Sequence, residues 1–128
     1  MHGKASILIV DDDPSHLKIY GLIVEGEGYR ALLAQVRYAG VELPENLDDP
    51  ADLVLMDYHL AGRTSAVEVV QSIQARMPNV PVLVLSDALA LPDDIAPFVQ
   101  GFVRKGNPAR LVDTLHALLR PSPMTTIP

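Results

Sequence analysis

Short apolar runs alternate along this chain with segments whose apolar residues recur at helical spacing, and this alternation is what most restricts the possible fold. Three of the runs are SILIV at 6–10, DLVLM at 52–56 and VPVLVL at 80–85. Runs apolar at nearly every position are typical of strands buried on both faces of a sheet. Residues 29–34 and 101–103 complete five expected strands.

The expected helices follow the strands in turn and cover 14–26, 35–43, 66–77, 95–99 and 108–119. Pro14 and Pro108 suit first helical positions, with Asp13 and Asn107 before them as caps. Such β-α alternation predicts an α/β fold, a doubly wound parallel sheet with helices on both faces. We assign residues 1–120 to one domain and 121–128 to a proline-rich tail or linker stub.

The charge balance and the residue types exclude several kinds of protein. The chain has 128 residues and a formal net charge of −6, which argues against direct binding to nucleic acid or an anionic membrane. It has no cysteine, so disulfides and thiolate metal sites are excluded. Its apolar stretches are far shorter than the roughly 20 residues that span a bilayer, and its N-terminus does not read as a signal peptide. We expect a cytoplasmic protein.

Polar side chains stand where the expected strands end. Asp11 and Asp12 follow the first strand, Asp57 the third, Ser86 the fourth and Lys105 the fifth. Ligands of open α/β sheets bind at these carboxyl ends. Converging carboxylates need a cation, and an oxygen-only donor set suits Mg²⁺. A hydroxyl and an ammonium beside it suit a phosphoryl group, which a carboxylate can accept as an acyl phosphate.

Each of these residues by itself is also typical of a helix cap, a turn or a solvated charge; their joint occurrence favours a site. The histidines are weaker signals. His59 lies two residues beyond Asp57 and could influence dephosphorylation, although a solvated loop histidine is the more ordinary interpretation. His16 and His116 lie on expected helices and are not at ligand spacing.

Four segments in this order resemble a known family. ILIVDDDP, VLMDYHL, VLVLS and FVRKG are similar to the acidic pair, the phosphoacceptor strand, the hydroxyl strand and the lysine strand of bacterial two-component response-regulator receiver domains. EGEGYRALLA resembles the family's link from first helix to second strand, and together these features span 6–119. The resemblance implies a flavodoxin-like five-stranded parallel sheet of order 2-1-3-4-5 with five helices.

The resemblance also implies a role for each site residue. Asp57 would take the phosphoryl group from a phosphohistidine of a sensor histidine kinase or phosphotransfer protein. Asp12 and Asp57 would ligate Mg²⁺ directly, Asp11 through water, and His59 through its backbone carbonyl. The chain would then be a signalling switch and not an enzyme in its own right.

The remaining implied roles concern the switch. Lys105 would pair with the phosphoryl oxygens, the Ser86 hydroxyl would hydrogen-bond them, and Phe102 matches the aromatic position that reports the change. A minor conformation would gain population and present a changed surface to an unknown downstream domain or protein.

Some positions depart from the family pattern: Ala61, Ser65, Asp87 and Gly106. Pro92 and Pro97 interrupt the expected fourth helix, so we expect it to be short or distorted.

Rival functions remain open at this point. The altered fourth helix also fits a receiver-like interaction module that does not signal through phosphorylation. A small Mg²⁺-dependent phosphatase and a flavin carrier fit less well, because the chain leaves no room for a substrate domain and no Ser/Thr/Gly-rich loop follows its first strand.

Overall fold

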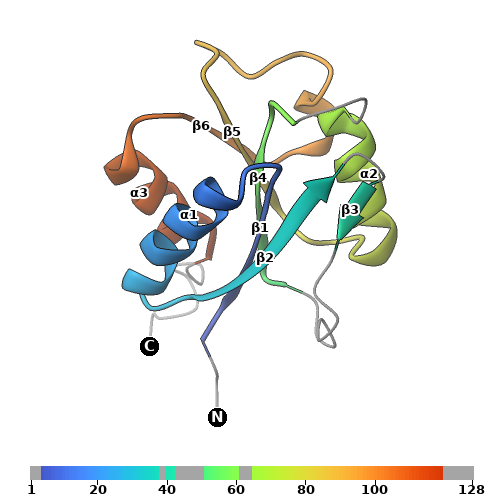
Figure 1. The fold of residues 1–128 in the computed structure, drawn as a ribbon. Helices are drawn as coiled ribbons and strands as arrows, with labels where there is room; N and C mark the ends of the chain where they lie inside the picture. The colour runs from blue at the N-terminus through green and yellow to red at the C-terminus, as the bar shows by residue number, and fades with distance from the viewer. Residues whose placement is uncertain (1–3, 38–39, 43–50, 61–64, 120–128) are drawn as a thin grey trace, which may run out of the picture.

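The structure is a computed structural model that describes residues 4–37, 40–42, 51–60 and 65–119. A six-stranded sheet runs through it in the order β3-β2-β1-β4-β5-β6 (Figure 1). The strands are β1 (Ser6–Asp11), β2 (Arg30–Arg37), β3 (Gly40–Glu42), β4 (Leu53–Asp57), β5 (Val82–Ser86) and β6 (Gly101–Arg104).

Five of the six strands are parallel. β1 pairs with β2 on one side and with β4 on the other, and β5 and β6 follow outward from β4. The predicted five-stranded parallel sheet, with the first strand between the second and third, is therefore confirmed. Its parallel register brings the carboxyl ends of β1, β4 and β5 to one edge of the molecule.

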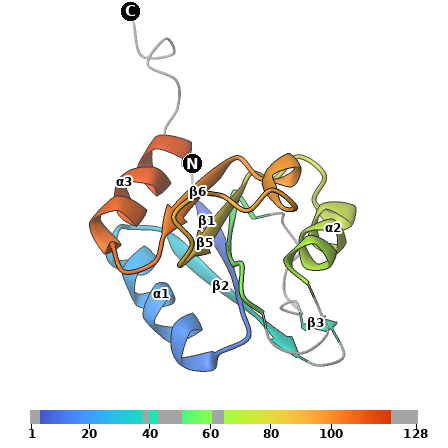
Figure 2. The ribbon, with the colours of Figure 1, turned by 90° about the horizontal axis from the view of Figure 1, so that it is seen from above.

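Helices cover both faces of this sheet. α1 (Pro14–Gly26) and α3 (Pro108–Leu119) pack on one face and α2 (Ala66–Arg76) packs on the other (Figure 2). Each helix begins with a side chain that accepts a backbone N–H: Asp13 from Ser15, Ser65 from Glu68 and Asn107 from Arg110. The predicted caps of the first and last helices are thus present. No helix in the described ranges is long and apolar enough to cross a bilayer.

The helix predicted over 35–43 was wrong. Gln35 continues β2, and after residues 38–39 the chain forms β3, which pairs antiparallel with β2 through Gln35–Glu42, Val36–Val41 and Arg37–Gly40. The cause is visible in the burial of β2, where Leu32, Ala34 and Val36 are buried and the residues between them are more exposed. This two-residue period is that of a strand, and it extends farther than the sequence prediction allowed.

The fourth helix is reduced to η1, a single 3₁₀ turn at Ala96–Phe98, as the interrupting prolines predicted. The described residues therefore contain three α-helices and this turn in place of five helices. Side-chain hydrogen bonds hold the segment: Tyr58 Oη donates to Asp94 Oδ1 at 2.8 Å and Gln74 Nε2 donates to the Phe98 carbonyl at 3.0 Å. Ala61 and the 121–128 tail lie outside the described residues.

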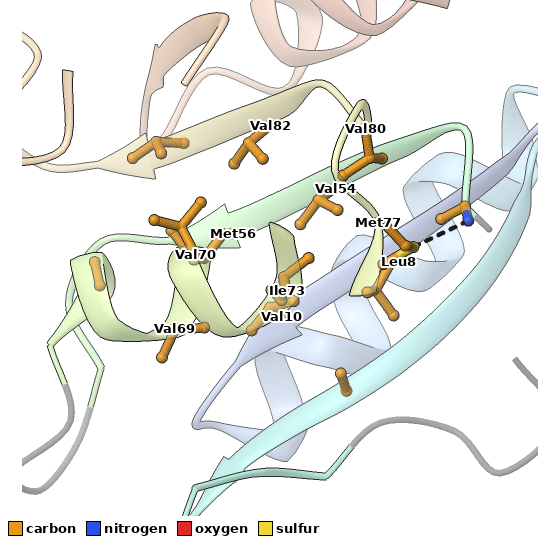
Figure 3. Packing of buried hydrophobic residues seen from close by; sticks show 14 of the residues in the cluster. Leu8, Val10, Val54, Met56, Val69, Val70, Ile73, Met77, Val80 and Val82 are labelled. Atoms are coloured by element: carbon orange, nitrogen blue, oxygen red, sulfur yellow. Dashed lines mark hydrogen bonds between the residues drawn. The ribbon is translucent and has the colours of Figure 1, made fainter. Parts of the chain in front are cut away.

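Two apolar layers sandwich the sheet. Under α2, Val69, Val70 and Ile73 pack against strand residues that include Val10 and Met56 (Figure 3). The opposite layer holds the alternate strand residues and the inner faces of α1 and α3. Both faces of the central strands are thus apolar, which is why their sequences read as continuous apolar runs.

Replacing Ile73 by alanine is expected to lower the free energy of unfolding by roughly 2–5 kcal/mol, because a side chain 1% exposed leaves a cavity between α2 and the sheet. Leu22→Ala, which truncates a side chain 63% exposed on α1, is the control and should change stability by less than about 0.5 kcal/mol. Urea unfolding followed by far-UV circular dichroism measures both. Equal losses in the two variants would contradict this packing.

Candidate functional site

Three polar side chains are buried among the described residues, and all three stand at the carboxyl ends of neighbouring parallel strands. Asp11 ends β1, Asp57 ends β4 and Ser86 ends β5, at 1%, 3% and 0% exposure. Burying two carboxylates near each other is costly unless charge partners offset it. This edge of the sheet is therefore where the chain concentrates polar chemistry.

Lys105 supplies one such partner. Its Nζ lies 2.9 Å from Asp57 Oδ1. The backbone N–H of Lys105 donates to the Ser86 carbonyl at 2.9 Å, so the pairing of β5 with β6 positions the residue. Burial alone would lower the pKa of Lys105, but the hydrogen bond and the charge of Asp57 outweigh it and hold the pKa above its ordinary value.

Gly106 follows Lys105 with φ of +87°. Glycine adopts this left-handed backbone at little cost, whereas proline is confined to φ near −65°. Gly106, which departs from the family pattern, thus allows a turn between Lys105, which reaches Asp57, and Asn107, which caps α3.

Among the acids of the site, Asp11 has a clearly raised pKa. The pKa of its carboxyl is raised to about 6, chiefly by burial and also by the hydrogen-bonded Asp12 side chain and the charge of Asp57, while a hydrogen bond from the Asp13 backbone N–H opposes the rise. A divalent cation between Asp11 and Asp57 would relieve this repulsion.

The backbone after β4 is hydrogen-bonded to the carboxylate of Asp57. The His59 N–H donates to Asp57 Oδ1 at 3.1 Å, and the Tyr58 N–H donates to the Leu85 carbonyl at 2.9 Å. The imidazole of His59 is exposed and packs edge-to-face against the Tyr58 ring, with centroids 5.2 Å apart. His59 therefore takes part in the site through its backbone.

The predicted switch residues have different surroundings. Ser86 Oγ accepts a hydrogen bond from the Ala88 N–H at 3.1 Å, which closes the turn after β5. Phe102 is half-buried on β6. Their roles in a conformational switch stay predictions.

One member of the site was missed. Ligand atoms of Asp11, Asp57 and His16 all lie within 4.8 Å of one another, so the prediction that His16 is not at ligand spacing was wrong. The error came from reading spacing along the chain: the first turn of α1 folds back over the end of β1. Asp12 is partly exposed and is not in this group.

The donor set fits a divalent cation. Two carboxylates supply oxygen ligands, and a cation beside Asp11 would favour its ionised form, whose pKa burial and the neighbouring acids raise. The buried Nδ1 of His16 has no hydrogen-bond partner among the described residues. Asp11 at the end of β1 and His16 on α1 therefore both present groups that a cation between them would stabilise.

Comparison with known proteins finds a family that matches nearly the whole described domain. The response regulator receiver domain family matches residues 7–115. The chain is 32% identical over 100 residues to the transcriptional regulatory protein GlrR of Escherichia coli, covering 78% of this chain and 22% of that protein. Over 87 residues it is 34% identical to the transcriptional regulatory protein ZraR of Salmonella typhimurium, covering 67% and 19%. The chain thus spans about a fifth of these relatives.

Solved structures agree on the fold. The chemotaxis protein CheY4 of Vibrio cholerae superposes with a TM-score of 0.74 at 22% identity, covering 91% of this chain and 100% of that one. The response regulator TrrA of Thermotoga maritima, solved in complex with Mg²⁺ and BeF, gives 0.73 at 24% identity, covering 90% and 99%. With the family match over 7–115, these findings establish that the chain belongs to the response regulator receiver domain family.

Proposed function

We propose that this chain is a phosphoacceptor: Asp57 takes a phosphoryl group from a phosphohistidine donor, and the phosphorylated state changes a protein-interaction surface. One observation carries the proposal. Asp57 is a buried carboxylate at the end of a central strand, with Lys105 Nζ at 2.9 Å and a second buried acid, Asp11, beside it. Membership of the receiver family supports the same function.

The reaction is an in-line displacement. A carboxylate oxygen of Asp57 attacks phosphorus, the P–N bond of the donor breaks, and its imidazole leaves with the bond's electron pair and takes up a proton. Oδ1 already accepts from Lys105 and His59, so Oδ2 is the oxygen assigned to attack. Such a transfer needs positioning and charge neutralisation more than covalent help.

The other residues stabilise the transferred group. Lys105 follows the phosphoryl oxygens as charge moves onto them, and the Ser86 hydroxyl leaves its bond with the Ala88 N–H to meet one of them. Bound Mg²⁺ supplies positive charge to both the acids and the phosphoryl group. Asp11, Asp12, Asp57 and the backbone carbonyl of His59 are the residues that would hold it.

The partners follow from this chemistry. The donor is a sensor histidine kinase or a phosphotransfer protein of the cytoplasm, and the receiver of the signal is a downstream domain or protein. The chain works as a switch and not as an enzyme. Movement of Ser86 and Phe102 shifts the population of the 87–98 segment, which is built unlike the usual fourth helix. Nothing in the comparisons favours an interaction module that does not signal through phosphorylation.

Incubating the chain with acetyl phosphate and Mg²⁺ is expected to add about 80 Da, the mass of one phosphoryl group, and Asp57→Asn should abolish the adduct. Intact-protein mass spectrometry measures it. Asp52→Asn is the matched control, since Asp52 is an exposed acid at the opposite end of the same strand. An adduct that persists in Asp57→Asn would refute the assignment.

Lys105→Ala should slow formation of the adduct by about 10²–10³-fold, because it removes a preorganised positive charge from the transferring group. Mg²⁺ affinity, measured by isothermal titration calorimetry, should be retained or increased, since Asp57 loses its competing partner. Arg104→Ala changes an exposed neighbouring cation and serves as control. An unchanged rate in Lys105→Ala would contradict the role.

The raised pKa of Asp11 predicts that the free energy of unfolding of the metal-free chain depends on pH. Its folded pKa of about 6 lies above the unfolded value of 3.8, so the metal-free protein loses stability as pH rises between these values. Asp12, Asp57 and His16 face the group.

Asp11→Asn should therefore stabilise the metal-free chain by about 1–3 kcal/mol above pH ~6 and by nothing near pH ~4, since one pKa unit is worth about 1.4 kcal/mol. Urea unfolding across this pH range tests it, with exposed Asp113→Asn as control. A gain that is the same at both ends of the range would show that the buried charge of Asp11 is not the cause.

A further inference from the structure

We propose that His16 is a further ligand at the cation site of Asp11 and Asp57, and that its imidazole makes this site favour divalent transition-metal ions over Mg²⁺. The inference rests on the proposed function, because it concerns the metal site that phosphoryl transfer needs. It adds a residue outside the acidic motif and a preference for one class of ion.

The geometry permits a single ion to reach all three side chains. The nitrogen of His16 and one oxygen each from Asp11 and Asp57 lie within 4.8 Å of one another. Metal–ligand bonds of about 2.1 Å place opposite ligands about 4.2 Å apart and adjacent ligands nearer. Small side-chain movements therefore suffice to close the three atoms around one ion.

The nitrogen that faces the acids makes no hydrogen bond among the described residues, and its contact with Asp11 is a long ion pair. His16 Nδ1 is buried and makes no hydrogen bond within the described part of the chain, although the side chain as a whole is 44% exposed. It lies 3.5 Å from Asp11 Oδ2, beyond hydrogen-bonding distance. A buried polar atom left unpaired is unfavourable, and a cation between it and the carboxylates would satisfy it.

The opposite side of the ring is oriented by another acid. His16 Nε2 lies 3.7 Å from Asp13 Oδ2. Asp13 is itself held, because its Oδ1 accepts the Ser15 N–H at 2.8 Å as the cap of α1. Carboxylates flank both ring nitrogens, Asp11 at 3.5 Å and Asp13 at 3.7 Å; with a cation bound to Asp11, Asp13 is the carboxylate left to hold the ring proton on Nε2, which leaves the Nδ1 lone pair for the ion. Metal-bound histidines commonly have such a carboxylate behind them.

The types of ligand atom then decide which ions bind with higher affinity. Carboxylate, carbonyl and water oxygens suit Mg²⁺, whereas imidazole suits Co²⁺, Ni²⁺ and Zn²⁺ and adds little for Mg²⁺. One imidazole beside two carboxylates should therefore raise affinity selectively for the transition-metal ions. The rival interpretation is a simple ion pair of protonated His16 with Asp11, in which the histidine has no part in metal binding.

Isothermal titration calorimetry of the intact chain with Co²⁺ and, separately, Mg²⁺ distinguishes these interpretations. His16→Leu should weaken Co²⁺ binding at least about tenfold and change Mg²⁺ binding less than about threefold. His116→Leu is the control, because its imidazole is hydrogen-bonded to Tyr29 and Glu27 and stands outside the ligand group, and it should change neither. His16→Gln keeps a polar side chain and covers the case in which His16→Leu fails to fold.

A second measurement reports on the nitrogen itself. In the ¹⁵N spectrum of the imidazole rings, Zn²⁺ should move the Nδ1 resonance of His16 and leave that of His116 unchanged. Equal weakening of Co²⁺ and Mg²⁺ in His16→Leu, or weakening of neither, would overturn the proposal, as would an unmoved Nδ1 resonance. Failure of the proposed function would look different: wild-type protein would gain no adduct from acetyl phosphate with Mg²⁺.

Discussion

The ion pair between Lys105 and Asp57 is the contact on which the functional edge of this molecule depends. Asp57 is buried beside Asp11, and two carboxylates in that position repel each other. Lys105 offsets half of this charge at 2.9 Å, while Asp11 remains with a pKa of about 6. One negative charge therefore remains without a full partner at this edge, and a bound cation would offset it.

The backbone of the sheet positions these charged groups, in addition to the contacts between their side chains. The N–H of Lys105 donates to the carbonyl of Ser86, and the N–H of Tyr58 donates to that of Leu85, so backbone pairing between adjacent strands positions the groups on both. His16 joins from α1 because Asp13 caps the helix directly after β1. A phosphoryl group that replaces one partner of Lys105 would alter contacts on three strands at once.

The opposite side of the site is where this chain differs from its relatives' pattern. A 3₁₀ turn replaces the fourth helix, and Tyr58, next to the acceptor, is hydrogen-bonded to Asp94 of the same segment. That bond raises the pKa of the Tyr58 hydroxyl. The residue that follows Asp57 is thus bonded directly to the segment that contains the 3₁₀ turn.

The sequence by itself determined the parallel sheet, the capped helices and the edge where Asp11, Asp57, Ser86 and Lys105 gather. Each of these follows from local periodicity and from the rule that parallel strands end together. Only the tertiary structure decided that 35–37 pairs with 40–42 and that His16 reaches the acids, because edge pairing and helix packing join atoms that sequence spacing keeps apart.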